Sequence, residues 1–404
     1  MIGGEIMLNE KGQRELAYIV EIDGIQPIEG ADRVEVALVG GWRIMVKKNQ
    51  FKPGDLAVYF EIDSKVPEKE PFMFLEGKHF RIKTQKYFKG TVISQGLLMA
   101  ADDFGWKTEL DVEGNPFSIG GHCKGDFVTE ILGITYADPE DNTRKAPSID
   151  KYKKMAGRHP KLFRNPVIKW IYGHNWGKKL LFVFFGKKDN KKTDWPSWVV
   201  KTDEERVQNM PWILEDKSEW IATEKIDGTS TTATLKMVGR KKHKFYICSR
   251  NVVFNSPDQK SYYDFNVYTE MAEKYHFEKV LRTLAERYNL EWVTLQGESF
   301  GAGVQKRDYD MEDHDFKGFN LIFSDRGRIN SVESAEIMKE FGIPWVPIVD
   351  EHFVLPDTVE ELLKIATDKS VVDGGMREGL VFRSKDGSRS FKAVSNEFLL
   401  KYHG

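Results

Sequence analysis

The feature that most constrains the fold is a series of short, alternating apolar segments over residues 16–135. Turn signals such as Gly40-Gly41 and Pro53-Gly54 separate these segments. Alternation with a period of two places apolar side chains on one face of a β-strand, and strands that recur about every ten residues indicate an all-β module. Closure into a small barrel hides the strand edges. We therefore expect residues 1–136 to form an OB-fold, a five-stranded β-barrel that commonly binds nucleic acid.

One stretch of this module carries cationic and aromatic side chains together. Arg81, Lys83 and Lys86 precede Tyr87 and Phe88. Cations can grip a sugar–phosphate backbone and aromatic rings can stack on bases. We expect the three basic residues to contact nucleic acid. The alternative is that they form an ordinary cationic outer face of the barrel.

The charge of the chain is distributed unevenly. The formal net charge is -2, yet residues 151–192 contain thirteen Lys or Arg residues and one acid, which gives this segment a net charge of +12. Such a block is either a solvated linker or a surface for a polyanion. We expect residues 137–200 to form a basic linker or insertion, with Lys178 and Lys179 as candidate contacts to nucleic acid.

The apolar runs, the first residues and the cysteines of the chain indicate where in the cell the protein is located. The longest nearly continuous apolar run, residues 180–185, is far shorter than the roughly 20 residues of a membrane span. The first residues lack the pattern of a secretory signal. The two cysteines, Cys123 and Cys248, offer neither a disulfide framework nor a Cys-x-x-Cys metal site. We expect a cytoplasmic protein without membrane contact, and a monomer.

Residues 201–404 mix strand and helix patterns and are expected to form a second domain, which makes the fold class α+β. Thr202 followed by Glu205 is typical of a capping box at the start of a helix. The expected strands lie at 220–223, 231–236 and 245–249, and the expected helices at 264–288, 331–341 and 359–367.

The most informative stretch of this domain is 223–230, which reads Thr-Glu-Lys-Ile-Asp-Gly-Thr-Ser and lies between two strands. A lysine at a strand end beside a Gly turn can face a cleft, and it becomes a nucleophile when its neighbours lower its pKa. Alone, Lys-x-Asp-Gly favours a surface turn. Further along the chain, other strands carry side chains that could bind a nucleotide, namely Arg250, Glu298, Phe319, Glu378 and Lys392. Acids can hold a divalent ion and a ribose, cations a triphosphate, and Phe a base, so the series predicts a nucleotide pocket.

In order and spacing, these residues resemble the motifs of the covalent nucleotidyltransferases, the superfamily of polynucleotide ligases and mRNA capping enzymes. The resemblance implies that Lys225 attacks the α-phosphate of a nucleoside triphosphate and that Lys392 contacts this phosphate. It implies nucleotide-binding roles for Glu224, Asp227, Arg250, Glu298, Phe319 and Glu378. It also implies that Asp227, Glu298 and Glu378 organise Mg²⁺ or Mn²⁺, directly or through water.

The position of the barrel, N-terminal to this domain, restricts the resemblance to one group of enzymes within the superfamily. Ser230 stands where DNA ligases and capping enzymes typically have Arg, and those enzymes place an OB domain after the last lysine motif. An N-terminal OB module followed by 201–209 is similar to the ATP-dependent RNA ligases of the Deinococcus and Naegleria type. This likeness makes Arg206 a candidate contact to nucleic acid, with plain helix surface as the alternative. Two departures are Ser390 in place of a second lysine and Asn320 in place of Asp.

The function that the resemblance implies is sealing of RNA. A lysyl-AMP intermediate formed from ATP would adenylate a 5′-phosphate end, which is then joined to a 3′-hydroxyl, at nicks in duplexes whose 3′-hydroxyl strand is RNA. Two alternatives stay open: a ligase that acts mainly on DNA, and a non-catalytic RNA- or tRNA-binding protein with an inactive transferase domain.

Overall fold

The computed structural model describes residues 15–137, 165–174, 178, 181, 195–202, 204–239, 242–254, 261 and 265–402. The chain divides into two compact units. One comprises Met1–Tyr136 with Thr193–Gly404, and the other comprises Ala137–Lys192. Among the described residues, no helix combines the length and the apolar character needed to cross a membrane.

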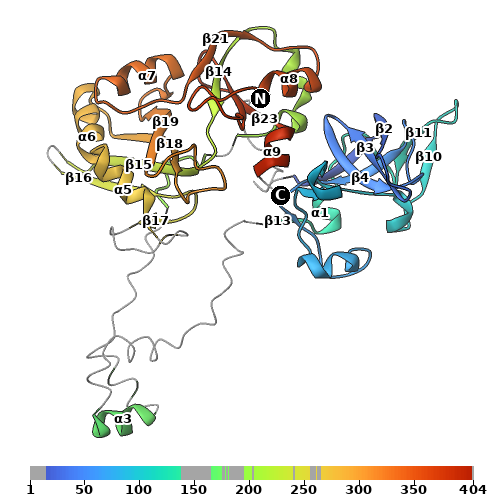
Figure 1. Ribbon diagram of the computed structural model, residues 1–404, viewed down its shortest axis with the longest axis horizontal. Coiled ribbons are helices and arrows are strands. Elements are labelled where there is room, and N and C mark those ends of the chain that lie inside the picture. Colours follow the sequence, from blue (N-terminus) through green and yellow to red (C-terminus); the bar gives the residue numbers. More distant parts are fainter. Residues whose placement is uncertain are drawn as a thin grey trace. The chain divides into compact units, whose positions relative to one another are not determined.

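The N-terminal part is built from short strands, as its alternating pattern predicts (Figure 1). β5 (Leu56–Phe60) pairs antiparallel with β1 (Ala17–Glu21) and with β9 (Leu97–Met99). A second sheet has the order β2 (Gly24–Pro27), β3 (Val34–Val39) and β4 (Trp42–Lys47). Trp42 and Tyr59 stack at 5.9 Å between ring centres in the core that joins the two sheets.

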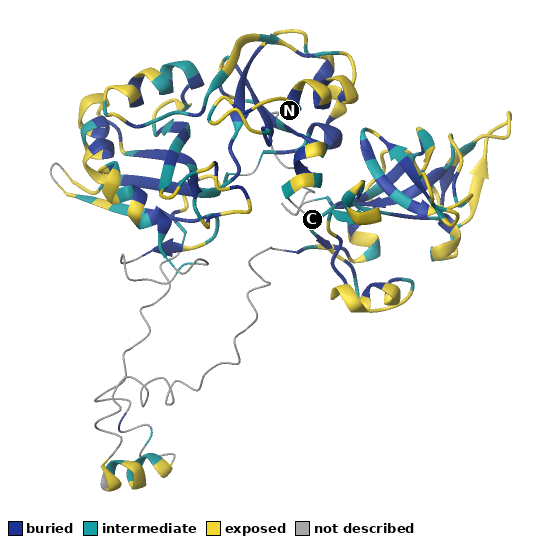
Figure 2. Cartoon of the chain, in the orientation of Figure 1, coloured by how far each residue is buried: buried dark blue, intermediate teal, exposed yellow. Residues whose placement is uncertain are grey.

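Smaller elements complete this part of the chain. Three further sheets are formed by β6 (Ser64–Lys65) with β13 (Thr135–Tyr136), by β7 (Gln85–Tyr87) with β8 (Val92–Ser94), and by β10 (Thr108–Leu110), β11 (Pro116–Ile119) and β12 (His122–Cys123). One short α-helix, α1 (Thr129–Leu132), lies between β12 and β13. Figure 2 shows the hairpin of β10 and β11 largely exposed, whereas the central strands are buried.

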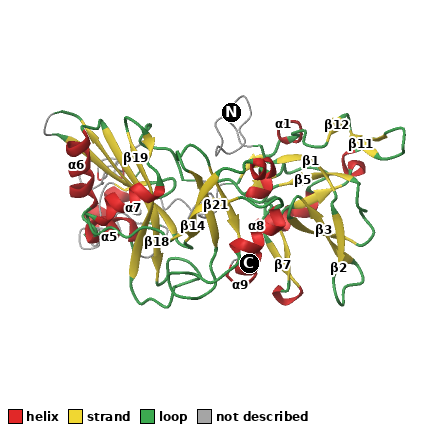
Figure 3. Ribbon diagram, turned by 90° about the horizontal axis from the view of Figure 1, so that it is seen from above, coloured by secondary structure: helices red, strands yellow, loops and turns green. Residues whose placement is uncertain are grey.

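A six-stranded antiparallel sheet forms one layer of the second domain. Its order is β17 (Val253–Phe254), β16 (His243–Cys248), β15 (Thr229–Met237), β18 (Trp292–Gly301), β19 (His314–Phe323) and β20 (Gly327–Arg328). Three helices pack on it, namely α5 (Val267–Lys274), α6 (Phe277–Tyr288) and α7 (Ser331–Lys339) (Figure 3). Leu281 and Leu284 of α6 lie in one buried core with Leu295 and Leu321 of the sheet, which explains the helical spacing of these apolar residues.

The second domain also contains a four-stranded sheet. Its order is β21 (Ile348–Val354), β14 (Glu219–Lys225), β22 (Gly379–Ser384) and β23 (Ser390–Val394). Helix α8 (Val359–Ala366) covers it through Leu362 and Leu363. Helix α9 (Asn396–Tyr402) follows β23. Because β14 ends at Lys225 and β15 begins at Thr229, the turn 226–228 carries the chain from one sheet to the other.

Two local predictions of the second domain are wrong. The helix expected at 264–288 is broken, because His276 adopts a left-handed backbone conformation with φ of 52° between α5 and α6. The capping box expected at Thr202 and Glu205 does not start an α-helix. The Glu205 carboxylate instead accepts hydrogen bonds from the backbone N–H of Arg206 and from Asn209. A short 3-10 helix, Val207–Asn209, follows.

The basic segment forms the separate unit Ala137–Lys192, and Thr193 begins the return to the main unit. Trp198, expected in the linker, instead donates a hydrogen bond to Thr234 of β15. Within the segment, the described residues include helix α3 (Pro166–Gly173) and Lys178, whose amine lies 5.7 Å from the centre of the Tyr172 ring. The predicted contact Lys179 lies outside the described residues.

Candidate active site

Lys225 is the last residue of β14, and three predicted acids surround its amine. Its Nζ donates to Oε2 of Glu378 at 2.8 Å, and Glu378 stands directly before β22, the strand paired with β14. Glu298 lies on β18 of the other sheet. Asp227 lies in the turn between the two sheets and is buried. The junction of the sheets therefore gathers residues that are far apart in the sequence.

Burial and mutual charge shift the pKa values of this cluster. Burial lowers the pKa of the Lys225 amine, but the carboxylates of Glu378, Glu298 and Asp227 raise it by more, and the net direction is upward. Burial, opposed by Lys225, raises the pKa of Glu298 to about 8. Lys225 therefore carries its proton in this state, and attack on a phosphate requires that the proton be lost.

The three acids around Lys225 carry the carboxylate oxygens that divalent ions such as Mg²⁺ prefer. Among the described residues, no group of three or more His, Cys, Asp or Glu side chains lies close enough to hold one metal ion. Asp227, Glu298 and Glu378 nevertheless influence one another electrostatically around the same amine. Mg²⁺ usually keeps several of its waters in proteins. The residues thus fit an ion held through water, as the resemblance allowed.

The predicted cations line a small polar cavity of about 80 Å³. Arg206, Arg250 and Lys392 contribute to its wall, together with Glu61, Asp63 and Tyr136 of the N-terminal part. An Nη of Arg250 donates to the Tyr136 hydroxyl at 3.3 Å. The backbone N–H of Lys392 donates to the carbonyl of Glu205 at 2.7 Å, which fixes β23 beside the segment that carries Arg206. Three acids, Glu61, Asp63 and Glu205, lie in the same wall, so the formal charges of the lining balance.

Arg206 is not plain helix surface. Its guanidinium lies 5.6 Å from the centre of the Trp42 ring, and within the described chain its Nη1 is buried without a hydrogen-bond partner. Burial of an unpaired cationic nitrogen is costly, which points to an absent anionic partner. Arg206 therefore stays a candidate contact to nucleic acid.

Two other predicted nucleotide contacts have different surroundings. Phe319 of β19 is half-buried and packs against a cluster that contains Ile226, the residue after Lys225. Glu224 is buried, and its carboxylate accepts hydrogen bonds from Ser370 and from the backbone N–H of Val371. Phe319 therefore lies beside the lysine turn, whereas Glu224 anchors the 370–371 segment.

The predicted nucleic-acid contacts of the barrel differ in accessibility. Lys83 is exposed, and Lys86 lies half-buried on β7. Arg81 is only 8% exposed, and its backbone forms an isolated bridge to Lys65. Lys83 and Lys86 remain candidate contacts, and the burial of Arg81 favours a structural role for it.

Sequence reasoning missed the residues that hold the lysine turn. The backbone N–H of Asp227 donates to the Tyr309 hydroxyl at 2.7 Å, and Nε2 of Gln305 donates to the Gly228 carbonyl at 3.0 Å. Both residues lie in the 302–313 segment between β18 and β19, which carries no strand or helix pattern. Sequence analysis also missed Glu61 and Asp63 of the barrel, which line the cavity beside the predicted cations.

Two family models match the chain. An OB-fold domain model matches residues 16–101, and an RNA ligase model matches residues 218–403. No curated protein matches the chain. The two models confirm the expected order of an OB-fold part followed by a ligase part.

Solved structures of one protein match nearly the whole chain. Naegleria gruberi RNA ligase with pyrophosphate is 29% identical, with a TM-score of 0.64 over 96% of this chain and 98% of that chain. A mutant of that ligase with ATP and manganese is 28% identical, with a TM-score of 0.65 over 97% and 100%. A mutant with AMP and manganese is 28% identical, with a TM-score of 0.65 over 96% and 99%. Residues 218–403 therefore carry an RNA ligase domain that follows an OB-fold domain, and nearly the whole chain is similar in fold to Naegleria gruberi RNA ligase.

Proposed function

We propose that this RNA ligase uses ATP and forms a covalent lysyl-AMP intermediate at Lys225. The observation that carries the proposal is the position of the Lys225 amine, 2.8 Å from Glu378 and surrounded by acids at the junction of two sheets. Arg250 and Lys392, two predicted cations of the ligase domain, line one cavity together with residues of the N-terminal part. The similar Naegleria structures contain ATP, AMP, pyrophosphate and manganese, which supports these ligands for this site.

In the first step, the Lys225 ammonium gives up a proton to solvent, Nζ attacks the α-phosphorus of ATP, a P–N bond forms, and the bond to pyrophosphate breaks. Glu378 orients the amine before the attack. Lys392, Arg250 and Arg206 hold the phosphates and stabilise the charge that develops on the leaving group. Magnesium or manganese, held through water by Asp227, Glu298 and Glu378, would neutralise the triphosphate and the acids that keep the amine protonated.

The later steps join the nucleic-acid ends. The 5′-phosphate of one end attacks the lysyl-AMP, which frees the lysine and leaves AMP on that end. The 3′-hydroxyl of the other end then attacks the adenylated phosphate and releases AMP. We assign the contacts with the duplex to Lys83 and Lys86 of the barrel. The preferred substrate is a nick whose 3′-hydroxyl strand is RNA.

The test is labelling with ATP that carries ³²P at the α-phosphate. The parent protein should retain the label after denaturation, and Lys225→Ala should retain none, because the attacking atom is gone. Lys236→Ala is the matched control, since Lys236 is also a strand lysine paired with an acid, Glu291, but lies at the far end of β15. Label on Lys225→Ala would contradict the assignment.

A second substrate separates the steps. Lys225→Ala should still seal a nick whose 5′ end already carries AMP, because the last step does not use the amine as a nucleophile. Nicks with RNA or DNA at the 3′-hydroxyl strand compare the two polymer classes. Equal sealing rates on both would remove the proposed preference for RNA.

A further inference from the structure

We propose that Tyr309 is a positioning residue for Lys225, and that it acts by holding the backbone of the turn that follows the lysine. The inference rests on the proposed function, because it assigns a role in lysyl-AMP formation. The hydroxyl of Tyr309 accepts the backbone N–H of Asp227 at 2.7 Å, in a buried contact between positions 82 residues apart. Asp227 is only two residues from the nucleophile, so a shift at this contact moves the lysine.

The ring of Tyr309 holds the same turn by packing. Tyr309 is 4% exposed and shares a buried cluster with Ile226, which lies between Lys225 and Asp227. Its ring meets Phe300 of β18 edge-on at 5.1 Å between centres. One side chain therefore fixes the turn twice, through its hydroxyl to the backbone of residue 227 and through its ring in the cluster of residue 226.

The backbone of Tyr309 is strained, and the surrounding contacts maintain the strain. Its φ is +58°, in the left-handed region that bulky residues seldom adopt. The Arg307 guanidinium lies 4.0 Å from the centre of the Tyr309 ring, and Arg307 pairs with Asp373 at 2.5 Å, with both side chains largely buried. Strain of this kind persists only where neighbouring structure imposes it, and it clusters at functional sites.

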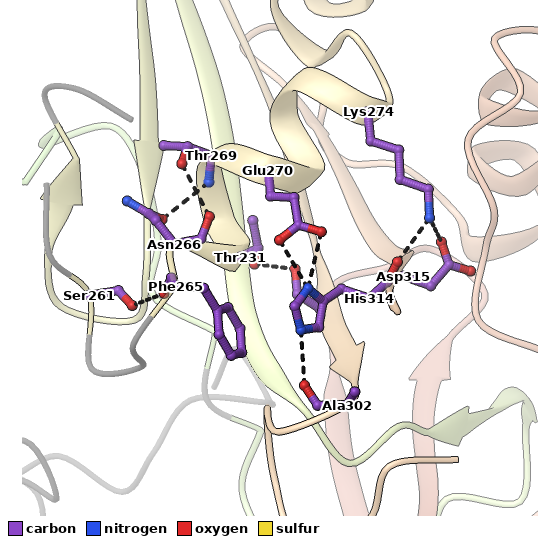
Figure 4. Close-up of polar contacts among 11 residues, drawn as sticks. Thr231, Ser261, Phe265, Asn266, Thr269, Glu270, Lys274, Ala302, His314 and Asp315 are labelled. Atoms are coloured by element: carbon purple, nitrogen blue, oxygen red, sulfur yellow. Dashed lines mark hydrogen bonds and ion pairs between the residues drawn. The ribbon is translucent and has the colours of Figure 1, made fainter. Parts of the chain in front are cut away.

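A contact between Ala302 and His314 holds the two ends of the 302–313 segment together, as Figure 4 shows. Nε2 of His314 lies 2.9 Å from the Ala302 carbonyl, which closes the segment at its two ends. Nδ1 of His314 faces the Glu270 carboxylate of α5, and the Phe265 ring stacks on the imidazole at 4.3 Å between centres. The segment thus reaches from a rigid base in the six-stranded sheet to the lysine turn, where Gln305 adds a second contact at the Gly228 carbonyl.

These contacts predict an effect on the rate of the chemical step and not on ATP binding. Tyr309→Phe keeps the ring, its packing and its contact with Arg307, and removes only the acceptor of the Asp227 N–H. A buried N–H without an acceptor is unfavourable, so the turn shifts to reach another partner. A misplacement of about 1 Å can cost about a hundredfold in rate.

The experiment measures single-turnover formation of lysyl-AMP against ATP concentration for the parent, Tyr309→Phe and Tyr268→Phe. Tyr268→Phe is the matched control, because it removes a phenol hydroxyl whose partner is the side chain of Thr229, beyond the turn. We expect Tyr309→Phe to lower the rate at saturating ATP at least tenfold, with a change below threefold in the ATP concentration for half-maximal rate. Tyr268→Phe should stay within threefold of the parent in both.

Other outcomes overturn the inference. A rate for Tyr309→Phe within twofold of the parent, or an equal loss in Tyr268→Phe, would show that the hydroxyl does not position the lysine. If Tyr309→Phe does not fold, Gln305→Leu at the exposed contact with the Gly228 carbonyl tests the same segment, and an unchanged rate there overturns the inference. A parent protein that forms no lysyl-AMP would refute the proposed function instead, so the two failures are distinguishable.

Discussion

Replacement of Gly228 by Ala should disable adenylation while leaving the domain folded. Gly228 follows Asp227 in the lysine turn, and its backbone lies against β18 of the neighbouring sheet. A Cβ at this position would lie 2.9 Å from Cγ of Glu298 and 3.1 Å from Cβ of Phe300, and closer still to the carbonyl of Ser299. The carbonyl belongs to the backbone of a paired strand, so it cannot rotate away as a side chain could.

The size of the effect follows from these distances. Ordinary van der Waals contact begins at 3.4 Å, so the turn must move away from β18 by about 1 Å, or Glu298 must leave its position. Both changes disturb the site, because the turn carries Lys225 and Asp227 and because Glu298 is one of the acids around the amine. We expect a loss of about a hundredfold or more in the rate of lysyl-AMP formation. Overpacking of this kind costs about 1–3 kcal/mol of stability, which lowers the Tm by several degrees.

The assay is single-turnover labelling with ³²P at the α-phosphate of saturating ATP, and thermal unfolding followed by circular dichroism reports the stability. Gly239→Ala is the matched control, because a Cβ there would have no neighbour within 4 Å. A rate for Gly228→Ala within threefold of the parent would refute the reasoning. An equal loss in Gly239→Ala would show that the effect comes from glycine replacement in general.

Two other predictions concern pH and salt. Because the pKa of Glu298 is raised to about 8, its carboxylate form is present above this pH and is lost below it. Adenylation at limiting Mn²⁺ should therefore rise as the pH passes through about 8, and Glu298→Gln should lack the part of the rise centred there; a flat profile for the parent would contradict the role of Glu298. If the basic segment lies along nucleic acid, neutralising substitutions should reduce the slope of log affinity against log salt by about 0.7–0.9 per lost phosphate contact, with adenylation unchanged. The test is a variant in which Ser replaces Lys178, Lys179, Lys187 and Lys188, and an unchanged affinity and slope would show a solvated linker.

Local pattern was enough to predict most strands and the main chemical groups. Apolar patterns predicted the strands at 220–223, 231–236 and 245–249, and the structure confirms them with small changes at the ends. Two predictions failed because the local pattern was compatible with more than one structure. The helix pattern of 264–288 continues through the residue that breaks it, His276, and the Thr202 and Glu205 pair lacks the helix that a capping box requires.

The sequence by itself determined the order of the domains and the residue types of the site. Strand periodicity and the motif around Lys225 are both local signals, which a few neighbouring residues are enough to define. Only the tertiary structure decided which groups meet. Lys225 contacts Glu378 across 153 positions because β14 and β22 pair in one register, and Tyr309 reaches Asp227 because the segment between β18 and β19 folds back onto the turn. Such contacts depend on how sheets pair and pack over the whole domain, and no local pattern encodes that geometry.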